Sequence, residues 1–174
     1  MLIKYCTRAV LLLFCLSTFG STQSQANPFL SRFNGTWQGE GKAFGMSARL
    51  DMKWDWVLGN KFLRLSLKNE MTGANGQKQV FEGQAYYKPV QSRSSSQPDV
   101  SGFEATWFDS RGVTFPIKAQ ADGDALVALW GSADQEQGKS VYRLLEPAKM
   151  EVIDSVRQKD GTWREFGRFV VVRQ

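Results

Sequence analysis

The chain has 174 residues, of which 42% are hydrophobic and 22% are charged, and its formal net charge is +5. This length and composition suit one globular domain with a hydrophobic core. The sequence contains no histidine, which excludes Ser-His-Asp and Cys-His catalysis as well as histidine-ligated zinc and haem. Carboxylates and hydroxyls remain, but they form no recognisable catalytic constellation. We predict no catalytic residue, no metal site and no cofactor, and we expect that the protein is not an enzyme.

The first 26 residues have the pattern of a signal peptide. Lys4 and Arg8 form a basic segment, residues 9–19 are apolar, and residues 24–26 resemble a cleavage site with small residues. Cleavage would remove both cysteines, and it would lower the net charge to +3 because this segment holds two of the 22 Lys and Arg residues and no acid. We predict a signal peptide over residues 1–26, a domain over residues 27–174, and a periplasmic or secreted protein without a membrane span after cleavage.

The domain is predicted to begin with a short helix and then to consist of strands. Asn27 and Pro28 fit the N-cap and the first position of a helix that runs to about Phe33. From Gly35 onward the hydrophobic residues recur with a period of two. The clearest case is residues 46–56, where the even-numbered positions are apolar and the odd-numbered positions are polar.

About ten short strands with turn residues between them predict an all-β fold. Residues 169–172 are apolar on both faces and would be an aggregation-prone free edge, so we expect this last strand to pair with the first. The fold expected is a single antiparallel up-and-down β-barrel with a short N-terminal helix. Besides residues 35–41 and 46–56, the predicted strands are residues 63–67, 81–87, 103–107, 113–119, 126–130, 139–145, 150–157 and 163–173.

One long loop is predicted inside the domain, over residues 89–99, which are rich in Ser and Gln. Neither half of the chain has enough strands to bury a core alone, so this segment is not expected to link two domains. Whether its Ser-rich part, residues 92–98, binds a partner stays open.

Aromatic residues on the predicted inward faces form the candidate site. Two interpretations stay open: the rings fill the barrel completely, or they wall a cavity for a ligand. Alanine and glycine residues on the same faces, such as Gly83, Ala85 and Ala128, leave room that favours a cavity. Arg64 or Tyr142 is expected to supply a polar contact. The predicted ligand-binding residues are Trp54, Trp56, Arg64, Tyr87, Trp107, Phe115, Trp130 and Tyr142.

Several motifs resemble those of the lipocalin-like (calycin) barrels. Gly35-Thr36-Trp37, with Gly-Glu-Gly following, resembles their opening motif, and the chain is most similar to the DUF1579 family of bacterial secreted proteins and more distantly to the nitrobindins. The resemblance implies that Trp37 closes one end of the barrel, with Arg173, or else Arg168, stacked over its ring. Nitrobindins bind haem through a histidine, so their haem chemistry does not carry over. The other motifs that resemble the DUF1579 family are residues 54–63, 81–87, 106–109 and 172–173.

The predicted function is that of a non-enzymatic exported barrel that binds a small, largely hydrophobic molecule in its interior. One alternative is a structural or protein-interaction barrel of the cell envelope with a filled core. Another is a lipid-modifying enzyme that acts through carboxylates. The charges are spread along the chain without a dense basic run, so no nucleic-acid partner is predicted, and we expect a monomer or a weak dimer.

Overall fold

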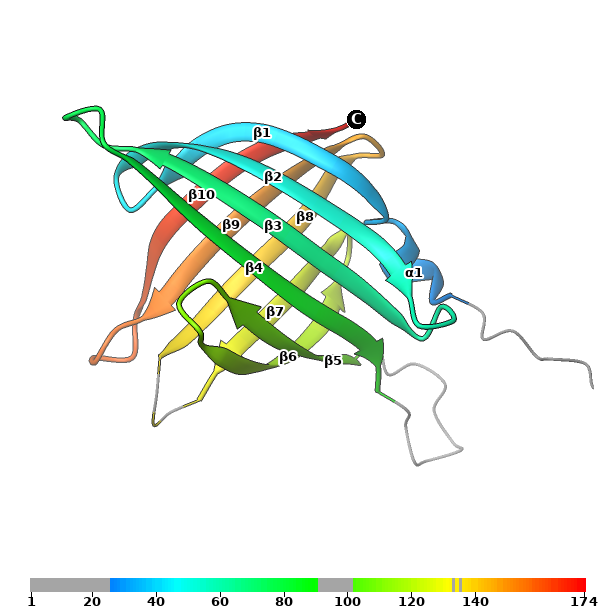
Figure 1. Cartoon of the computed structure of the whole chain (residues 1–174). Coiled ribbons are helices and arrows are strands. Elements are labelled where there is room, and N and C mark those ends of the chain that lie inside the picture. The colour runs from blue at the N-terminus through cyan, green and yellow to red at the C-terminus, as the bar shows by residue number, and fades with distance from the viewer. Residues whose placement is uncertain (1–25, 91–101, 133, 135) are drawn as a thin grey trace, which may run out of the picture.

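The computed structural model describes residues 26–90, 102–132, 134 and 136–174, which form a closed antiparallel barrel with one short helix (Figure 1). This confirms the predicted all-β barrel. The predicted signal peptide, apart from Ala26, and the Ser-rich segment 92–98 lie outside the described residues. The elements are α1 (Pro28–Ser31), β1 (Gly35–Ala43), β2 (Met46–Val57), β3 (Phe62–Thr72), β4 (Lys78–Pro89), β5 (Gly102–Asp109), β6 (Thr114–Asp122), β7 (Ala125–Gly131), β8 (Gln137–Glu146), β9 (Lys149–Arg157) and β10 (Trp163–Arg173).

The strands follow one another around the barrel in chain order, and β10 closes it by pairing with β1. The register of this last pair places Trp37 opposite Arg173 and Gly41 opposite Phe169. Closure leaves the apolar strand β10 with a hydrogen-bonded neighbour on each side, which removes the free edge that its composition would make hazardous. The predicted pairing of the last strand with the first is confirmed.

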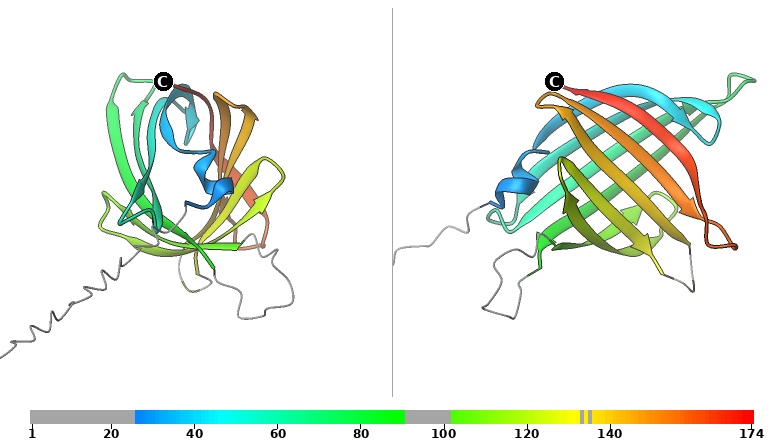
Figure 2. Two further views of the ribbon diagram at one scale, coloured as in Figure 1. Left: turned by 90° about the vertical axis from the view of Figure 1, so that its right-hand side faces the viewer. Right: turned by 180° about the vertical axis from the view of Figure 1, so that it is seen from behind.

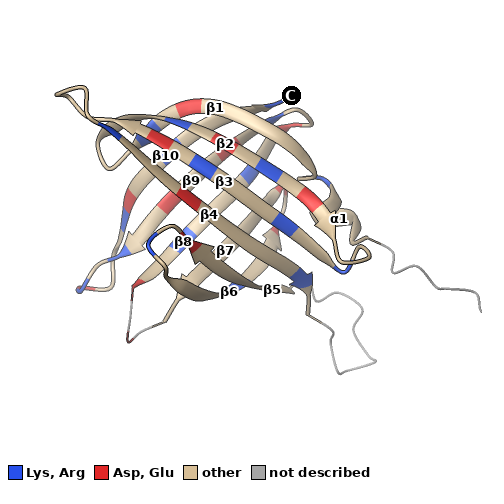
Figure 3. Ribbon diagram, viewed as in Figure 1, with Lys and Arg blue, Asp and Glu red and all other residues tan. Residues whose placement is uncertain are grey.

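Alternation along each strand sorts the side chains between the interior and the surface. On β2, Ala48, Leu50, Met52 and Trp54 are buried, while the polar residues between them lie on the outer face. Basic and acidic residues are interspersed along the strands (Figure 3). No helix in the described part of the chain is both long enough and apolar enough to cross a membrane.

One end of the barrel is closed by α1 and the residues that follow it (Figure 2). Asn27 caps this helix by accepting a hydrogen bond from the Leu30 amide at 3.0 Å, and Pro28 starts it, as predicted. Trp37 is fully buried beneath the helix, and its indole nitrogen donates to the Phe33 carbonyl at 2.8 Å. Any opening into the interior must therefore lie at the other end.

Arg173 lies over the buried tryptophan at this closed end. Its guanidinium carbon is 4.3 Å from the centre of the Trp37 ring, which is a cation–π contact. The same guanidinium donates hydrogen bonds to the backbone carbonyls of Arg32, Asn34 and Pro147. Arg173 thus joins the segment after α1, the β8–β9 turn and the C-terminus. Arg168 lies elsewhere, on the outer face of β10, where it pairs with Glu151 and Glu165.

Candidate functional site

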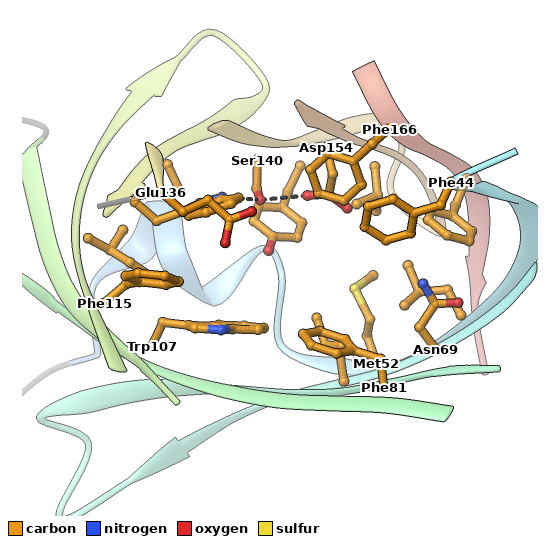
Figure 4. Close-up of a pocket in the computed structure, with 18 of the residues that line it drawn as sticks. Phe44, Met52, Asn69, Phe81, Trp107, Phe115, Glu136, Ser140, Asp154 and Phe166 are labelled. Atoms are coloured by element: carbon orange, nitrogen blue, oxygen red, sulfur yellow. Dashed lines mark hydrogen bonds between the residues drawn. The ribbon is translucent and has the colours of Figure 1, made fainter. Parts of the chain in front are cut away.

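The barrel encloses a cavity of about 210 Å³ between the α1 end and the opposite rim (Figure 4). Its walls are mainly aromatic and aliphatic side chains from nearly every strand. The residues that line it are Phe44, Leu50, Met52, Leu67, Asn69, Met71, Phe81, Tyr87, Trp107, Arg111, Phe115, Ile117, Ala128, Trp130, Glu136, Ser140, Tyr142, Val152, Asp154, Phe166 and Phe169.

Five of the eight residues predicted to bind a ligand line this cavity: Tyr87, Trp107, Phe115, Trp130 and Tyr142. They come from β4, β5, β6, β7 and β8, so residues far apart in sequence meet because consecutive strands are neighbours around the barrel. Phe115 and Trp130 pack against each other with ring centres 5.6 Å apart, at an interplanar angle of 31°. The rings therefore form a continuous apolar wall on this side.

The other three predicted residues lie outside the cavity. Trp54 is fully buried nearer the closed end, where its ring contacts Phe33 at 5.7 Å and Tyr142 at 5.1 Å between centres. Trp56, one step further along β2, reaches α1 and donates to the Ser31 hydroxyl at 3.2 Å. Alternation shows which side of the sheet a residue faces but not how far along the barrel axis it lies. The contacts with Phe33 and with Ser31 place Trp54 and Trp56 at the closed end of the barrel.

Arg64 is on the outer face of β3, opposite in direction to its buried neighbours Leu63 and Leu65. Its guanidinium forms a two-pronged pair with Asp55 of β2, with nitrogen–oxygen distances of 2.7 and 3.1 Å. The prediction that Arg64 supplies a polar contact to an internal ligand does not agree with this position, because the strand backbone separates the side chain from the cavity.

Two glycines allow the large tryptophan rings to lie close against the barrel wall. Gly138 is the direct partner of Trp130 across β7 and β8, and a Cβ atom at Gly138 would fall less than 3.0 Å from the indole ring. Gly83 on β4 lies diagonal to Trp107 of β5, two residues from its direct partner Ala85, and a Cβ atom at Gly83 would also fall less than 3.0 Å from the indole ring. Without these glycines each indole would be displaced from the wall. The space that small residues leave at these two positions is thus filled by tryptophan.

A chain of hydrogen bonds crosses the wall formed by β7, β8 and β9. The indole nitrogen of Trp130 donates to the Ser140 hydroxyl at 3.2 Å, and that hydroxyl donates to Oδ1 of Asp154 at 2.6 Å. Burial raises the pKa of Asp154 to about 6, and the Ser140 hydrogen bond offsets part of this effect. Asp154 is thus an ionisable carboxyl group held in a fixed orientation in an apolar cavity.

Three further polar groups face the interior. Burial raises the pKa of Tyr87 and that of Tyr142, and the nearby Asp154 charge adds to the effect in both, so the two phenols stay neutral. Asn69 lies on the opposite wall from Asp154 (Figure 4), is 9% exposed, and its Oδ1 atom has no hydrogen-bond partner within the described part of the chain. A buried polar atom without a partner is uncommon in proteins.

A charged cluster and a pair of phenylalanines mark the rim. The Arg111 guanidinium lies 2.8 Å from the Asp109 carboxylate and 3.4 Å from that of Glu136. Burial alone would raise the pKa of Asp109, but hydrogen bonds from Arg111 and from the Trp107 indole outweigh it, so the pKa is lowered. The rings of Phe44 and Phe166 stack beside the opening with centres 4.7 Å apart. The rim is therefore partly charged and partly apolar.

Tyr87 and Tyr142 were among the sequence predictions, but Asn69, Ser140 and Asp154 were not. The signal was available in the alternation: Asp154 continues the inward row of Met150 and Val152 on β9, and Asn69 continues the inward row of Leu65 and Leu67 on β3. A polar residue in a row of buried apolar residues marks either a buried hydrogen bond or a ligand contact. No group of three or more Cys, Asp or Glu residues that could hold a metal ion occurs among the residues described.

Comparisons with solved structures reveal similar folds. Rv2717c from M. tuberculosis is 14% identical and aligns with a TM-score of 0.61 over 86% of this chain and 99% of its own. The S-type phycobiliprotein lyase CPES from Guillardia theta is 10% identical and aligns with a TM-score of 0.56 over 84% of this chain and 90% of its own. No family model and no curated protein sequence matches the chain. At these identities the similarity shows the fold alone, a calycin-like ten-stranded barrel.

Proposed function

We propose that this protein is a non-enzymatic, exported barrel that binds a small, largely hydrophobic molecule in its cavity. The observation that carries the proposal is the cavity itself, which is enclosed by aromatic rings and includes a few fixed polar groups. Small-molecule sites in proteins typically combine these two features, an apolar lining and a few oriented polar groups.

The size of the cavity limits the ligand. Its 210 Å³ exceed the ~150 Å³ of an apolar cavity that holds benzene, and they fall below the ~300 to 1,000 Å³ of sites for drug-sized molecules. A ligand with one or two rings fits this range. Burying about 300 Å² of its apolar surface would contribute roughly 7 kcal/mol before the entropy cost of association, which corresponds to micromolar binding at best.

The comparisons support this proposal at the level of the fold. One structural neighbour is named as a phycobiliprotein lyase, and its barrel resembles this one over most of both chains. The motifs around Gly35-Thr36-Trp37 and residues 54–63 lead us to place the chain with the DUF1579-like secreted barrels as part of the same proposal. Export to the periplasm or beyond, based on the pattern of residues 1–26, belongs to it as well.

Titration with a neutral bicyclic probe such as naphthalene, followed by calorimetry, tests the proposal on the mature protein. We expect saturable binding with one site per chain. Trp107→Ala should weaken binding at least about tenfold, because this ring forms part of the cavity wall. Its removal costs the ligand both buried contact area and an aromatic contact of about 0.5–1.5 kcal/mol. Phe108→Ala is the matched control, since this neighbouring ring is 45% exposed on the outer face and should leave binding unchanged.

Two outcomes would contradict the proposal. The first is the absence of binding across a panel of one-ring and two-ring apolar molecules, which would favour a structural or protein-interaction barrel. The second is binding that is weakened equally by Trp107→Ala and Phe108→Ala, because it would place the ligand outside the cavity. Independently of these titrations, mass spectrometry of molecules that co-purify with the native protein would identify the ligand class directly.

A further inference from the structure

We propose that the cavity selects a small organic amine, in which an ammonium group attached to an apolar ring body pairs with the carboxylate of Asp154. This inference rests on the proposed function and narrows it, because it names the chemical class of the ligand. It follows from four features of the cavity: the orientation of Asp154, the surrounding rings, the distribution of charge, and the polar group on the opposite wall.

The Asp154 carboxylate is positioned as an acceptor for a ligand. Its Oδ1 atom is fixed by the Ser140 hydroxyl at 2.6 Å, and Ser140 is in turn fixed by the indole nitrogen of Trp130 at 3.2 Å. Its Oδ2 atom accepts no hydrogen bond from any residue in the described ranges. Because the side chain lines the cavity, this second oxygen is the natural partner of a donor that enters with the ligand.

The aromatic wall adds to the attraction for a cation. Trp107, Phe115, Trp130 and Tyr142 line the same cavity as Asp154, and the faces of such rings carry partial negative charge. An ammonium group among several ring faces is stabilised by cation–π interactions that strengthen when water is excluded. The apolar body of the same ligand gains from burial against these rings, so one wall recognises both parts of an arylalkyl amine.

The charges that face the cavity favour a cation over an anion. Arg111 is the one Lys or Arg side chain that lines it within the described residues, and it lies at the rim, engaged by Asp109 at 2.8 Å and Glu136 at 3.4 Å. No basic side chain in the described ranges pairs with Asp154. A carboxylate ligand would therefore meet the uncompensated charge of Asp154, whereas an ammonium group would neutralise it.

Asn69 supplies a second point of polar contact on the opposite wall. It is 9% exposed, lines the cavity, and its Oδ1 atom has no donor within the described part of the chain. An unpartnered buried acceptor costs stability unless a ligand or water satisfies it. The Asn69 side chain thus makes the wall opposite Asp154 partly polar, so a ligand with its ammonium group at Asp154 and a second polar group at its far end also suits the cavity.

The test uses three probes of nearly equal shape: 2-naphthylmethylamine, 2-naphthalenemethanol and 2-naphthoate, which are a cation, a neutral alcohol and an anion. Calorimetry on the mature protein at pH 7.5 should rank the amine first, at least about tenfold tighter than the alcohol, with the anion weakest, because charge-assisted hydrogen bonds are about twice as strong as neutral ones. Asp154→Asn should abolish this preference while the alcohol still binds. Asp122→Asn, which removes an exposed carboxylate at the β6–β7 turn, should leave it intact.

A second measurement needs no variant. The preference for amine over alcohol in the wild-type protein should fall as the pH is lowered through about 6, where Asp154 takes up a proton. The other titratable groups that face the cavity are Tyr87 and Tyr142, which stay neutral over this range, and the rim residues Arg111 and Glu136. An alkylammonium group keeps its charge over the same range, so the change reports on Asp154.

The outcomes separate this inference from the proposed function. If the alcohol or the carboxylate binds as tightly as the amine, the inference is overturned while ligand binding in the cavity stands. If none of the three probes binds, the inference fails, and the proposed function fails with it when the panel of one-ring and two-ring apolar molecules is silent as well. If the amine preference persists unchanged in Asp154→Asn and across pH 5 to 8, the cation lies elsewhere and the assignment of Asp154 is wrong.

Discussion

The indole ring of Trp130 on β7 covers Gly138, the residue directly opposite it on β8. A glycine usually weakens the strand in which it lies, because glycine has no side chain to pack. Here the neighbouring ring occupies the place of the missing side chain, and its nitrogen reaches Ser140 two residues further along β8. The glycine thus sets the position of the tryptophan, and the tryptophan fixes the hydroxyl that orients Asp154.

Gly138→Ala should disturb both stability and the cavity. The added Cβ atom would lie less than 3.0 Å from the Trp130 ring, so the indole must move. We expect a loss of about 1–3 kcal/mol in the free energy of unfolding, the usual cost of overpacking, and weaker ligand binding. Urea denaturation and calorimetry check the two effects. Gly73→Ala is the control, because the nearest atom to its added Cβ would be Oδ1 of Asn75 at 3.2 Å. Equal effects of the two variants would contradict the account.

Arg173→Ala should destabilise the closed end of the barrel. The variant loses the cation–π contact with Trp37 and three hydrogen bonds to backbone carbonyls, so we expect it to lower the free energy of unfolding by about 1–3 kcal/mol. Arg173→Lys should recover only part of this, since an ammonium group lacks the planar fork of donors. Chemical denaturation measures both variants, with the exposed Arg164→Ala on the same strand as a control. A change below about 0.5 kcal/mol for Arg173→Ala would refute the role of this contact.

Asp154 should make the stability of the barrel fall as the pH rises. Its pKa is raised from 3.8 to about 6 in the folded protein, so between these values the folded state binds more protons than the unfolded state. The unfavourable contribution is absent below about pH 4, develops up to about pH 6, and is complete above it. Asp154→Asn removes this contribution. The free energy of unfolding of the variant, relative to that of the wild type, should therefore be on the order of 2–3 kcal/mol higher at pH 7.5 than at pH 4.

Denaturation of both proteins at several pH values measures that difference, and subtracting the two curves cancels the other titrating groups they share. These include Asp109, Asp160 and Glu165, whose pKa values are lowered and whose effects on stability have the opposite sign. If the difference between Asp154→Asn and wild type does not change between pH 4 and pH 7.5, the carboxyl group is not buried as the structure has it.

The sequence predicted the fold better than the site, for a physical reason. Strand periodicity reports which face of a sheet a residue occupies, and the alternation over residues 46–56 predicts the inward row of β2 correctly. It contains no information on how far along the barrel axis each inward residue lies. Trp54 and Trp107 both face inward, yet Trp54 packs beneath the cavity near α1 and Trp107 lines it.

The polar half of the site was harder to predict. Asp154 and Ser140 come from different strands, and their 2.6 Å hydrogen bond depends on the register of β8 and β9, in which they are direct partners. Register follows from the turn and from a bulge near residue 145, which residue patterns alone do not fix. The interruption of an apolar inward row by Asp154 and by Asn69 was the sequence signal for these groups.

The most direct test of the central claim, that the cavity binds a ligand, is to fill it. Ala128 is fully buried on β7 and lines the cavity, so Ala128→Phe would place a ring in the space that the ligand needs. Calorimetric titration with a neutral bicyclic probe should show one-site binding to the wild-type protein and to Leu129→Ala, an outward-facing control, and at least a tenfold loss of affinity for Ala128→Phe. Unchanged affinity in a folded Ala128→Phe protein would contradict the account, because the probe would then bind outside the cavity.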